Sequence, residues 1–171
     1  MYPIEVKKKP EGQNIPTKKE LPITLIVDTE KLYHIEQPAR EDINAYCELY
    51  DSNPPETHKH DRIEHFESIV VPGQQVKWIA LPKDKNSEYT VAIESVVYAA
   101  YKKNELDDFR EANFFNAIAI CSSDGEKVHA KIKDDFEKGS YVYIYNLNFK
   151  ISLGGLNEKC YSIDPRLKID Q

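Results

Sequence analysis

The segment from residue 66 to residue 79, Phe-Glu-Ser-Ile-Val-Val-Pro-Gly-Gln-Gln-Val-Lys-Trp-Ile, constrains the fold more than any other part of the chain. Two short runs rich in β-branched and aromatic residues flank Pro72 and Gly73. Proline fixes the φ angle wanted at the second residue of a turn, and glycine accepts the positive φ that follows in a type II turn. Because a type II turn splays its flanking strands, the segment predicts two strands that follow one another in a layered β structure.

The composition agrees with this β interpretation. A chain of 171 residues is long enough to bury a hydrophobic core within one domain. Its 40% hydrophobic and 11% aromatic content is typical of a folded globular protein. Eleven tyrosines against one methionine, together with many valines and isoleucines, favour strands over helices.

The net charge argues against binding to nucleic acid. The whole chain carries a formal charge of −6 at neutral pH. Residues 1–20 contain five lysines and three glutamates, which is +2, so residues 21–171 carry −8. Such an acidic body repels a phosphate backbone. No apolar stretch approaches the roughly 20 residues needed to span a bilayer, so no membrane association is predicted either.

Three cysteines, Cys47, Cys121 and Cys160, stand far apart and form no CxxC pair. This odd number at wide spacing indicates reduced, mostly buried thiols. The first residues lack the apolar core of a signal peptide. Together these features predict a cytoplasmic protein.

Alternating apolar residues mark most of the strands. The first strand, residues 23–28, is apolar on both faces, so we expect it inside a sheet. Residues 43–50 fit a strand or a short helix, residues 29–37 fit one helical turn, and Asp124-Gly125 predicts a hairpin. Further strands are predicted on either side of Pro72-Gly73 and at 89–98, 114–121, 128–132, 140–152 and 161–169, the last broken at Pro165.

About eight short strands that do not alternate with helices predict an all-β fold. We expect a two-layer antiparallel β-sandwich of the cupredoxin or immunoglobulin kind. One short helix is expected within residues 102–113, where apolar residues recur at helical spacing. Residues 1–21, rich in lysine and proline, are expected to form a disordered N-terminal arm. Residues 22–171 are then the single β-sandwich domain.

One cluster suggests metal chemistry. His58, His60 and His65 lie close together in a polar stretch with several carboxylates. Imidazoles at H-x-H spacing project to one side of an extended chain, and with a carboxylate they suit Zn²⁺ or Cu²⁺. The alternative is a solvated surface loop with no bound metal, and this reading is favoured because all its ligands come from one loop. The leading expectation is therefore no cofactor.

Catalytic signatures are otherwise missing from the sequence. It contains no G-x-S-x-G, H-E-x-x-H, P-loop or G-x-G-x-x-G motif. Trp78 and the tyrosines of residues 141–145 could stack on a sugar, as in a carbohydrate-binding module, but their phase within the strands favours core packing. No enzymatic activity is predicted.

The order of several motifs resembles the PixA/AidA-like inclusion-body proteins of bacteria. The motifs are an opening strand with an acidic turn (residues 25–30), Pro-Gly-x-x-Val-x-Trp (72–78), a long aromatic strand (140–151) and Tyr-x-x-Asp-Pro-x-Leu-x-Ile (161–169). The resemblance implies a cytosolic, non-enzymatic β-sandwich that accumulates or self-associates. It also implies a structural role for Asp164 and Pro165, which would end one strand and set the direction of the closing strand.

These features predict a protein that works through its surfaces. The expected partner is a second copy of the chain, in a homo-oligomer, or another protein. The N-terminal arm could add to the sheet edge of a neighbouring copy. The metal-binding loop and the carbohydrate-binding module remain the alternative functions.

Overall fold

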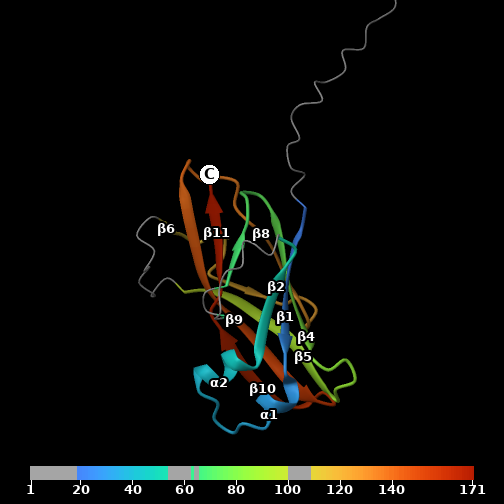
Figure 1. The fold of residues 1–171 in the computed structure, drawn as a ribbon. Coiled ribbons are helices and arrows are strands. Elements are labelled where there is room, and N and C mark those ends of the chain that lie inside the picture. The colour runs from blue at the N-terminus through green and yellow to red at the C-terminus, as the bar shows by residue number, and fades with distance from the viewer. Residues whose placement is uncertain (1–18, 54–62, 64–65, 100–108) are drawn as a thin grey trace, which may run out of the picture.

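The computed structural model describes residues 19–53, 63, 66–99 and 109–171. These residues form two packed layers of strands, with two short helices at one end of the sandwich (Figure 1). In chain order the elements are β1 (Leu21–Val27), α1 (Thr29–Tyr33), α2 (Arg40–Ala45), β2 (Cys47–Asp51), β3 (Glu67–Ile69), β4 (Gln75–Pro82), β5 (Tyr89–Tyr98), β6 (Arg110–Glu111), β7 (Ala119–Cys121), β8 (Val128–Lys131), β9 (Ser140–Leu153), β10 (Leu156–Ile163) and β11 (Arg166–Asp170).

The first layer is a four-stranded sheet in the order β2-β1-β4-β8. β1 lies between β2 and β4, as the apolar residues on both of its faces predict. The second layer is a seven-stranded sheet with the path β3-β11-β9-β5-β7, and β6 and β10 also pair with β9. The prediction of an all-β, two-layer sandwich is confirmed.

The prediction that the sheets are antiparallel is wrong for three strand pairs. β1 runs parallel to β4, β3 parallel to β11, and β6 parallel to β9. Parallel neighbours need long connections that cross between layers, and single-strand periodicity cannot reveal them. Of the expected helix at residues 102–113, residues 102–108 lie outside the described residues. The prediction is wrong for the described end, where Arg110–Glu111 form the strand β6. The two helices observed stand between β1 and β2, where Asp28 caps α1 by accepting a hydrogen bond from the Lys31 amide at 3.5 Å.

The chain changes layers at the turn that the sequence predicts most firmly. The Gln74 amide donates to the Val71 carbonyl at 3.1 Å, and Gly73 has a φ of 78°. These values define a type II turn with Pro72 at its second position. β3 before the turn belongs to the seven-stranded sheet, and β4 after it belongs to the four-stranded sheet.

The predicted hairpin at Asp124-Gly125 is wrong, because β7 and β8 belong to different sheets. A two-residue type I′ hairpin needs positive φ at both central residues, and here only Gly125 has it, at 79°. The Asp124 carboxylate instead accepts from the amides of Glu126 and Lys127, which shapes a wider turn. Gly154 and Gly155 both have positive φ and do join β9 to β10 as a hairpin.

A long strand ladder forms the centre of the second layer. β10 and β11 lie end to end along β9 in one register, since Ile163 faces Leu147 and Arg166 faces Ile144. The first half of β9 is buried on both faces and its second half on one, as its sequence pattern predicts. On the far face, Val142 and Ile144 pack with Ala99 and Phe109.

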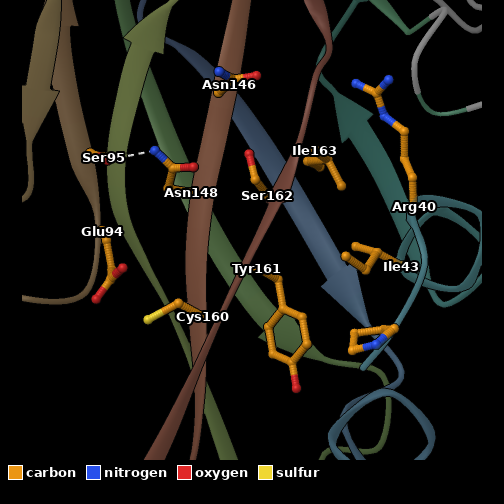
Figure 2. A pocket seen from close by; sticks show the side chains of 11 residues that line it. Arg40, Ile43, Glu94, Ser95, Asn146, Asn148, Cys160, Tyr161, Ser162 and Ile163 are labelled. Atoms are coloured by element: carbon orange, nitrogen blue, oxygen red, sulfur yellow. Dashed lines mark hydrogen bonds between the residues drawn. The ribbon is translucent and has the colours of Figure 1, made fainter. Parts of the chain in front are cut away.

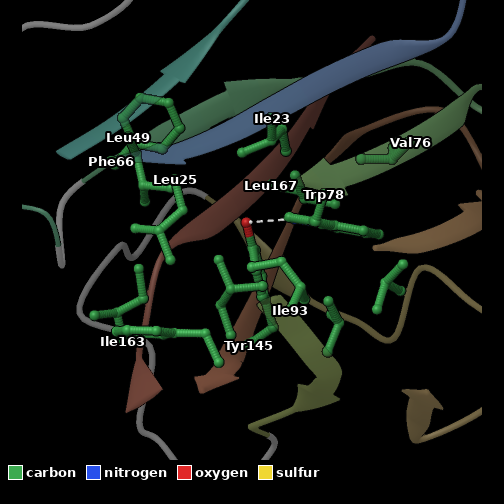
Figure 3. Close-up of a cluster of buried hydrophobic side chains, with 14 of the residues drawn as sticks. Ile23, Leu25, Leu49, Phe66, Val76, Trp78, Ile93, Tyr145, Ile163 and Leu167 are labelled. Atoms are coloured by element: carbon green, nitrogen blue, oxygen red, sulfur yellow. Dashed lines mark hydrogen bonds between the residues drawn. The ribbon is translucent and has the colours of Figure 1, made fainter. Parts of the chain in front are cut away.

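The main core lies between the two sheets and centres on Trp78 of β4 and Tyr145 of β9 (Figure 3). Both side chains are fully buried, and the indole Nε1 donates to the tyrosine hydroxyl at 3.1 Å across the interface. Aromatic rings continue this contact, with Tyr143 stacked on Tyr145 at 5.4 Å between centroids. The inward residues of β1 complete the core around them (Leu21, Ile23, Leu25 and Val27).

Candidate functional site

The histidines of the predicted metal site, His58, His60 and His65, lie outside the described residues. Within the described ranges, no group of three or more His, Cys, Asp or Glu residues is placed to hold a metal ion. The zinc or copper alternative therefore stays a prediction from the sequence.

The other residues singled out in the sequence have structural surroundings. Trp78 has no exposed surface, so it cannot stack on a sugar. Asp164 and Pro165 lie between β10 and β11, opposite the middle of β9, where the Pro165 carbonyl accepts from the Tyr145 amide at 3.3 Å. Asp164 is 9% exposed, and its carboxylate accepts a hydrogen bond from the Arg40 guanidinium at 2.5 Å. This contact ties α2 to the closing strand.

The prediction that the cysteines are mostly buried is wrong for two of the three. Cys47 is buried, and burial raises the pKa of its thiol to about 12. Cys121 and Cys160 are exposed, and all three are free thiols. Cys121 ends β7, a strand at the edge of the second sheet, and Cys160 sits at an outward position of β10.

A cleft of about 640 Å³ lies beside β5, β9 and β10, next to the segment that begins α2 (Figure 2). Short polar side chains from three neighbouring strands line it. Their registers place Ser95 and Ser162 on either side of Asn148. The Asn148 amide donates to the Ser95 hydroxyl at 3.0 Å. The lining residues are Pro38, Arg40, Ile43, Glu94, Ser95, Asn146, Asn148, Cys160, Tyr161, Ser162 and Ile163.

The electrostatics of this cleft suit hydrogen bonding more than covalent chemistry. Burial, and then the neighbouring Glu94 carboxylate, raise the pKa of the Cys160 thiol. A thiol with a raised pKa stays protonated and is a poor nucleophile. Arg40 is already engaged with Asp164. The cleft therefore offers amide and hydroxyl groups to a polar molecule.

A second surface lies on the outer side of the four-stranded sheet, and we call it the open face. Its central residues come from three adjacent strands: Thr24 faces both Tyr50 and Ile79, and Ile26 faces both Glu48 and Leu81. Tyr50 is 54% exposed and Leu81 is 48% exposed. Both helices lie at one end of the sandwich (Figure 1), where Lys31 of α1 and Ala45 of α2 lie beside Ile26 and Glu48, and no other described strand packs over this face. The open face consists of Pro22, Thr24, Ile26, Glu48, Tyr50, Lys77, Ile79, Leu81, His129 and Lys131.

Charged side chains stand at two rims of the open face. β2 contributes Glu48 at one rim, and β8 contributes Lys131 at the other, with Lys131 Nζ 3.5 Å from Asp134 Oδ2. β2 is also an edge strand, because among the described strands it pairs only with β1. An exposed apolar sheet face beside an unpaired strand edge is typical of a surface that contacts another chain.

Sequence reasoning did not identify either surface. Asn146 and Asn148 do stand out as the polar side of β9, but their neighbours on β5 and β10 follow only from the strand registers. The apolar residues of the open face are spread over β1, β2 and β4. One signal was present: Ile26 is apolar on the face of β1 opposite to the core.

The chain resembles a solved structure, the crystal structure of an inclusion body protein (PixA) from Burkholderia cenocepacia J2315. The TM-score is 0.52 with 11% sequence identity, over 89% of this chain and 94% of that chain. At this identity the likeness concerns the fold. No family model matches the sequence, and no curated protein matches it. Among the described residues, no helix is long and apolar enough to cross a membrane.

Proposed function

We propose that this protein is a non-enzymatic β-sandwich that works by self-association, in an assembly related to inclusion bodies. The observation that carries the proposal is the open face, where the half-buried Ile26 and Ile79 lie beside the exposed Leu81 and Tyr50, with no other described strand packed over them. The shared fold with an inclusion body protein adds support. The occupant of the open face is a second copy of the same chain.

Charge supports a second copy over an unrelated partner. Glu48 lies at one rim of the open face, and Lys131, whose ammonium also pairs with Asp134, lies at the other. A twofold axis in the plane of the face, parallel to its strands, sets each acidic rim against the basic rim of the other copy. Such an interface is isologous and closes as a dimer. Two sheets packed in this way stand about 10 Å apart with interleaved side chains.

The size of the open face sets the expected strength of the contact. Four strands about 4.8 Å apart, with up to eight residues each, offer roughly 20 by 25 Å. Specific interfaces bury about 800 Å² on each partner, so the open face, at roughly 500 Å², is smaller than a standard interface. We therefore expect pairing that is reversible and depends on protein concentration.

Light scattering coupled to size exclusion tests the proposal with two matched variants. Leu81→Glu places a charge on the apolar part of the open face and should return the particle to the 19.8 kDa monomer. Leu156→Glu makes the same change at a residue that is more exposed, 70% against 48%, but lies in the β9–β10 hairpin. It should leave the mass unchanged. A wild-type protein that is monomeric at every concentration, or equal masses for both variants, would contradict the proposal.

A further inference from the structure

A second cleft, of about 700 Å³, lies between the end of β4 and the beginning of β5, and we call it the β4–β5 cleft. The loop of residues 83–88 joins these two strands and contributes to the lining. Residues 125–127 cross between the two sheets and also line the cleft. The Glu126 carbonyl of this crossing segment accepts a hydrogen bond from the Ile93 amide of β5 at 2.9 Å. Two strands and two loops therefore frame the cleft, and every residue that lines it lies within the described ranges.

The backbone of β5 directs an amide and a carbonyl toward this cleft. The Ile93 amide donates to Glu126, so it points away from β9, although Ile93 faces Phe149 in the register of these strands. The backbone groups of successive residues in a strand point alternately to its two sides. Val91, two residues earlier, therefore also turns its N–H and C=O away from β9. Val91 lines the cleft, and no described residue forms a hydrogen bond with these two groups.

The backbone of β4 offers a second such pair of groups. The amide of Lys83, at the end of β4, donates to the Val27 carbonyl of β1 at 2.8 Å. By the same alternation, Ala80 directs its N–H and C=O away from β1, to the side on which β8 lies. β8 pairs with β4 only as far as Trp78. In the described part of the chain the Ala80 groups therefore have no partner, and Ala80 also lines the cleft.

Apolar side chains lie beside these backbone groups. Ile79 of β4 and Ala92 of β5 line the cleft, and both are half-buried. The hydroxyls of Thr90 and Ser152 also line it, and they lie 2.8 Å apart in a hydrogen bond with each other. The walls thus combine apolar contact area with main-chain donors and acceptors, which is the combination that an extended peptide matches.

The charged side chains of the cleft leave an excess of positive charge. Lys85 and Lys127 come from the two loops that frame it, and neither forms an ion pair within the described ranges. Lys150 is already engaged, since its Nζ lies 3.1 Å from Glu158 Oε1. Glu126 is the other carboxylate of the lining. Two ammonium groups against one unengaged carboxylate favour an anionic ligand.

We propose that the β4–β5 cleft binds a short peptide with a free carboxyl end and an apolar last side chain. Its peptide group exchanges hydrogen bonds with the N–H and C=O of Val91 or Ala80. Its carboxylate pairs with Lys85 and Lys127, and its apolar side chain packs on Ile79. The volume of the cleft lies within the range of about 300–1,000 Å³ that is usual for ligand sites. This inference goes beyond the proposed function, since self-association does not need a bound peptide.

An NMR titration of the full-length chain with N-acetyl-leucine tests the site. This compound carries a peptide-like amide, a carboxylate and an apolar side chain. The amide signals of Val91 and Ala80 should shift more than those of Thr90 and Ala92, which face β9 by the same alternation. Shifts spread evenly over residues 89–92 would overturn the inference.

Three further compounds separate the contributions of the ligand groups. N-acetyl-leucinamide lacks the carboxylate, and isocaproate lacks the amide, so each should bind several-fold more weakly than N-acetyl-leucine. The peptide acetyl-Ala-Ala-Leu should bind more tightly than N-acetyl-leucine, because it adds main-chain hydrogen bonds to the same strands. Equal binding of N-acetyl-leucine and its amide would contradict the role of the lysines. Weaker binding of the longer peptide would contradict a peptide as the ligand.

Matched lysine variants locate the carboxylate. Lys85→Gln and Lys127→Gln should each weaken the binding of N-acetyl-leucine several-fold. The control is Lys83→Gln, which makes the same change in the same loop at a residue that does not line the cleft. It should leave the affinity unchanged, and equal losses for Lys85→Gln and Lys83→Gln would overturn the inference. Neither Lys85 nor Lys127 belongs to the open face, so a failed titration would leave the pairing proposal standing.

Discussion

The outer surfaces of the two sheets differ, although their inner surfaces are alike. Inside, both sheets present large apolar and aromatic side chains that meet at Trp78 and Tyr145. Outside, the four-stranded sheet exposes Tyr50 and Leu81 on the open face. The seven-stranded sheet exposes asparagine and serine in the cleft beside α2. The inner positions determine stability, and the outer positions determine what each layer can contact.

The difference between inner and outer positions can be tested most directly by a substitution at the centre of the inner surface. Trp78→Ala should lower the free energy of unfolding by about 3–5 kcal/mol, because it leaves a large cavity and removes the donor to Tyr145. Urea denaturation followed by circular dichroism measures this loss. A loss below about 1 kcal/mol would mean that the two sheets do not share the core described above.

A smaller effect is expected from the hydrogen bond alone. Tyr145→Phe keeps the ring but leaves the buried Trp78 indole without an acceptor, which should cost about 1–2 kcal/mol. The same denaturation experiment measures it. The matched change on the outer surface, Ser95→Ala next to Asn148, should change stability by less than about 0.5 kcal/mol. Equal losses for the two variants would contradict the distinction between inner and outer positions.

The contact between α2 and the closing strand should have an effect of intermediate size. Arg40→Ala removes the hydrogen bond to Asp164 and should cost about 1 kcal/mol, since the arginine side chain is 56% exposed and solvent weakens the pair. Arg40→Lys keeps the charge without the planar fork and should recover part of the loss. Thermal unfolding of the three proteins measures the order. An unchanged midpoint for Arg40→Ala would show that α2 is held by other contacts.

The smallest expected effect is the contribution of the buried Cys47 to the pH dependence of stability. Burial raises the pKa of this thiol from 9.0 to about 12. The unfolded chain loses the thiol proton near the lower value, whereas the folded chain keeps it up to the higher one, so stability falls as pH rises between them. Cys47→Ala should therefore show a shallower decline of the urea midpoint above pH 9 than the parent protein. Parallel declines would contradict the assignment to Cys47.

Local strand patterns allowed much of the fold to be predicted from the sequence. Residues 89–98 form β5 as expected, and the long strand at 140–152 corresponds to β9, which extends to Leu153. The ambiguous segment 43–50 combines both alternatives, because α2 ends at Ala45 and β2 begins at Cys47. In these regions side-chain alternation or turn chemistry decides the structure locally.

The pairing of distant strands could not be predicted from the same patterns. The parallel pairing of β1 with β4 joins segments separated by two helices and two strands. For the same reason the open face was missed, since Ile26, Tyr50 and Leu81 become neighbours only when β1 pairs with both β2 and β4. The cleft depends on the registers of β9 with β5 and β10. Periodicity identifies which side of a strand is buried but does not identify its neighbours.

A dilution series followed by methyl NMR tests the central claim most directly. If two copies pair through the open face, the methyl signals of Ile26, Ile79 and Leu81 should shift as the protein is concentrated. The signals of Leu156 and Ile118, which are exposed elsewhere, should stay constant. Shifts confined to these two residues, or constant signals at every concentration, would contradict the account.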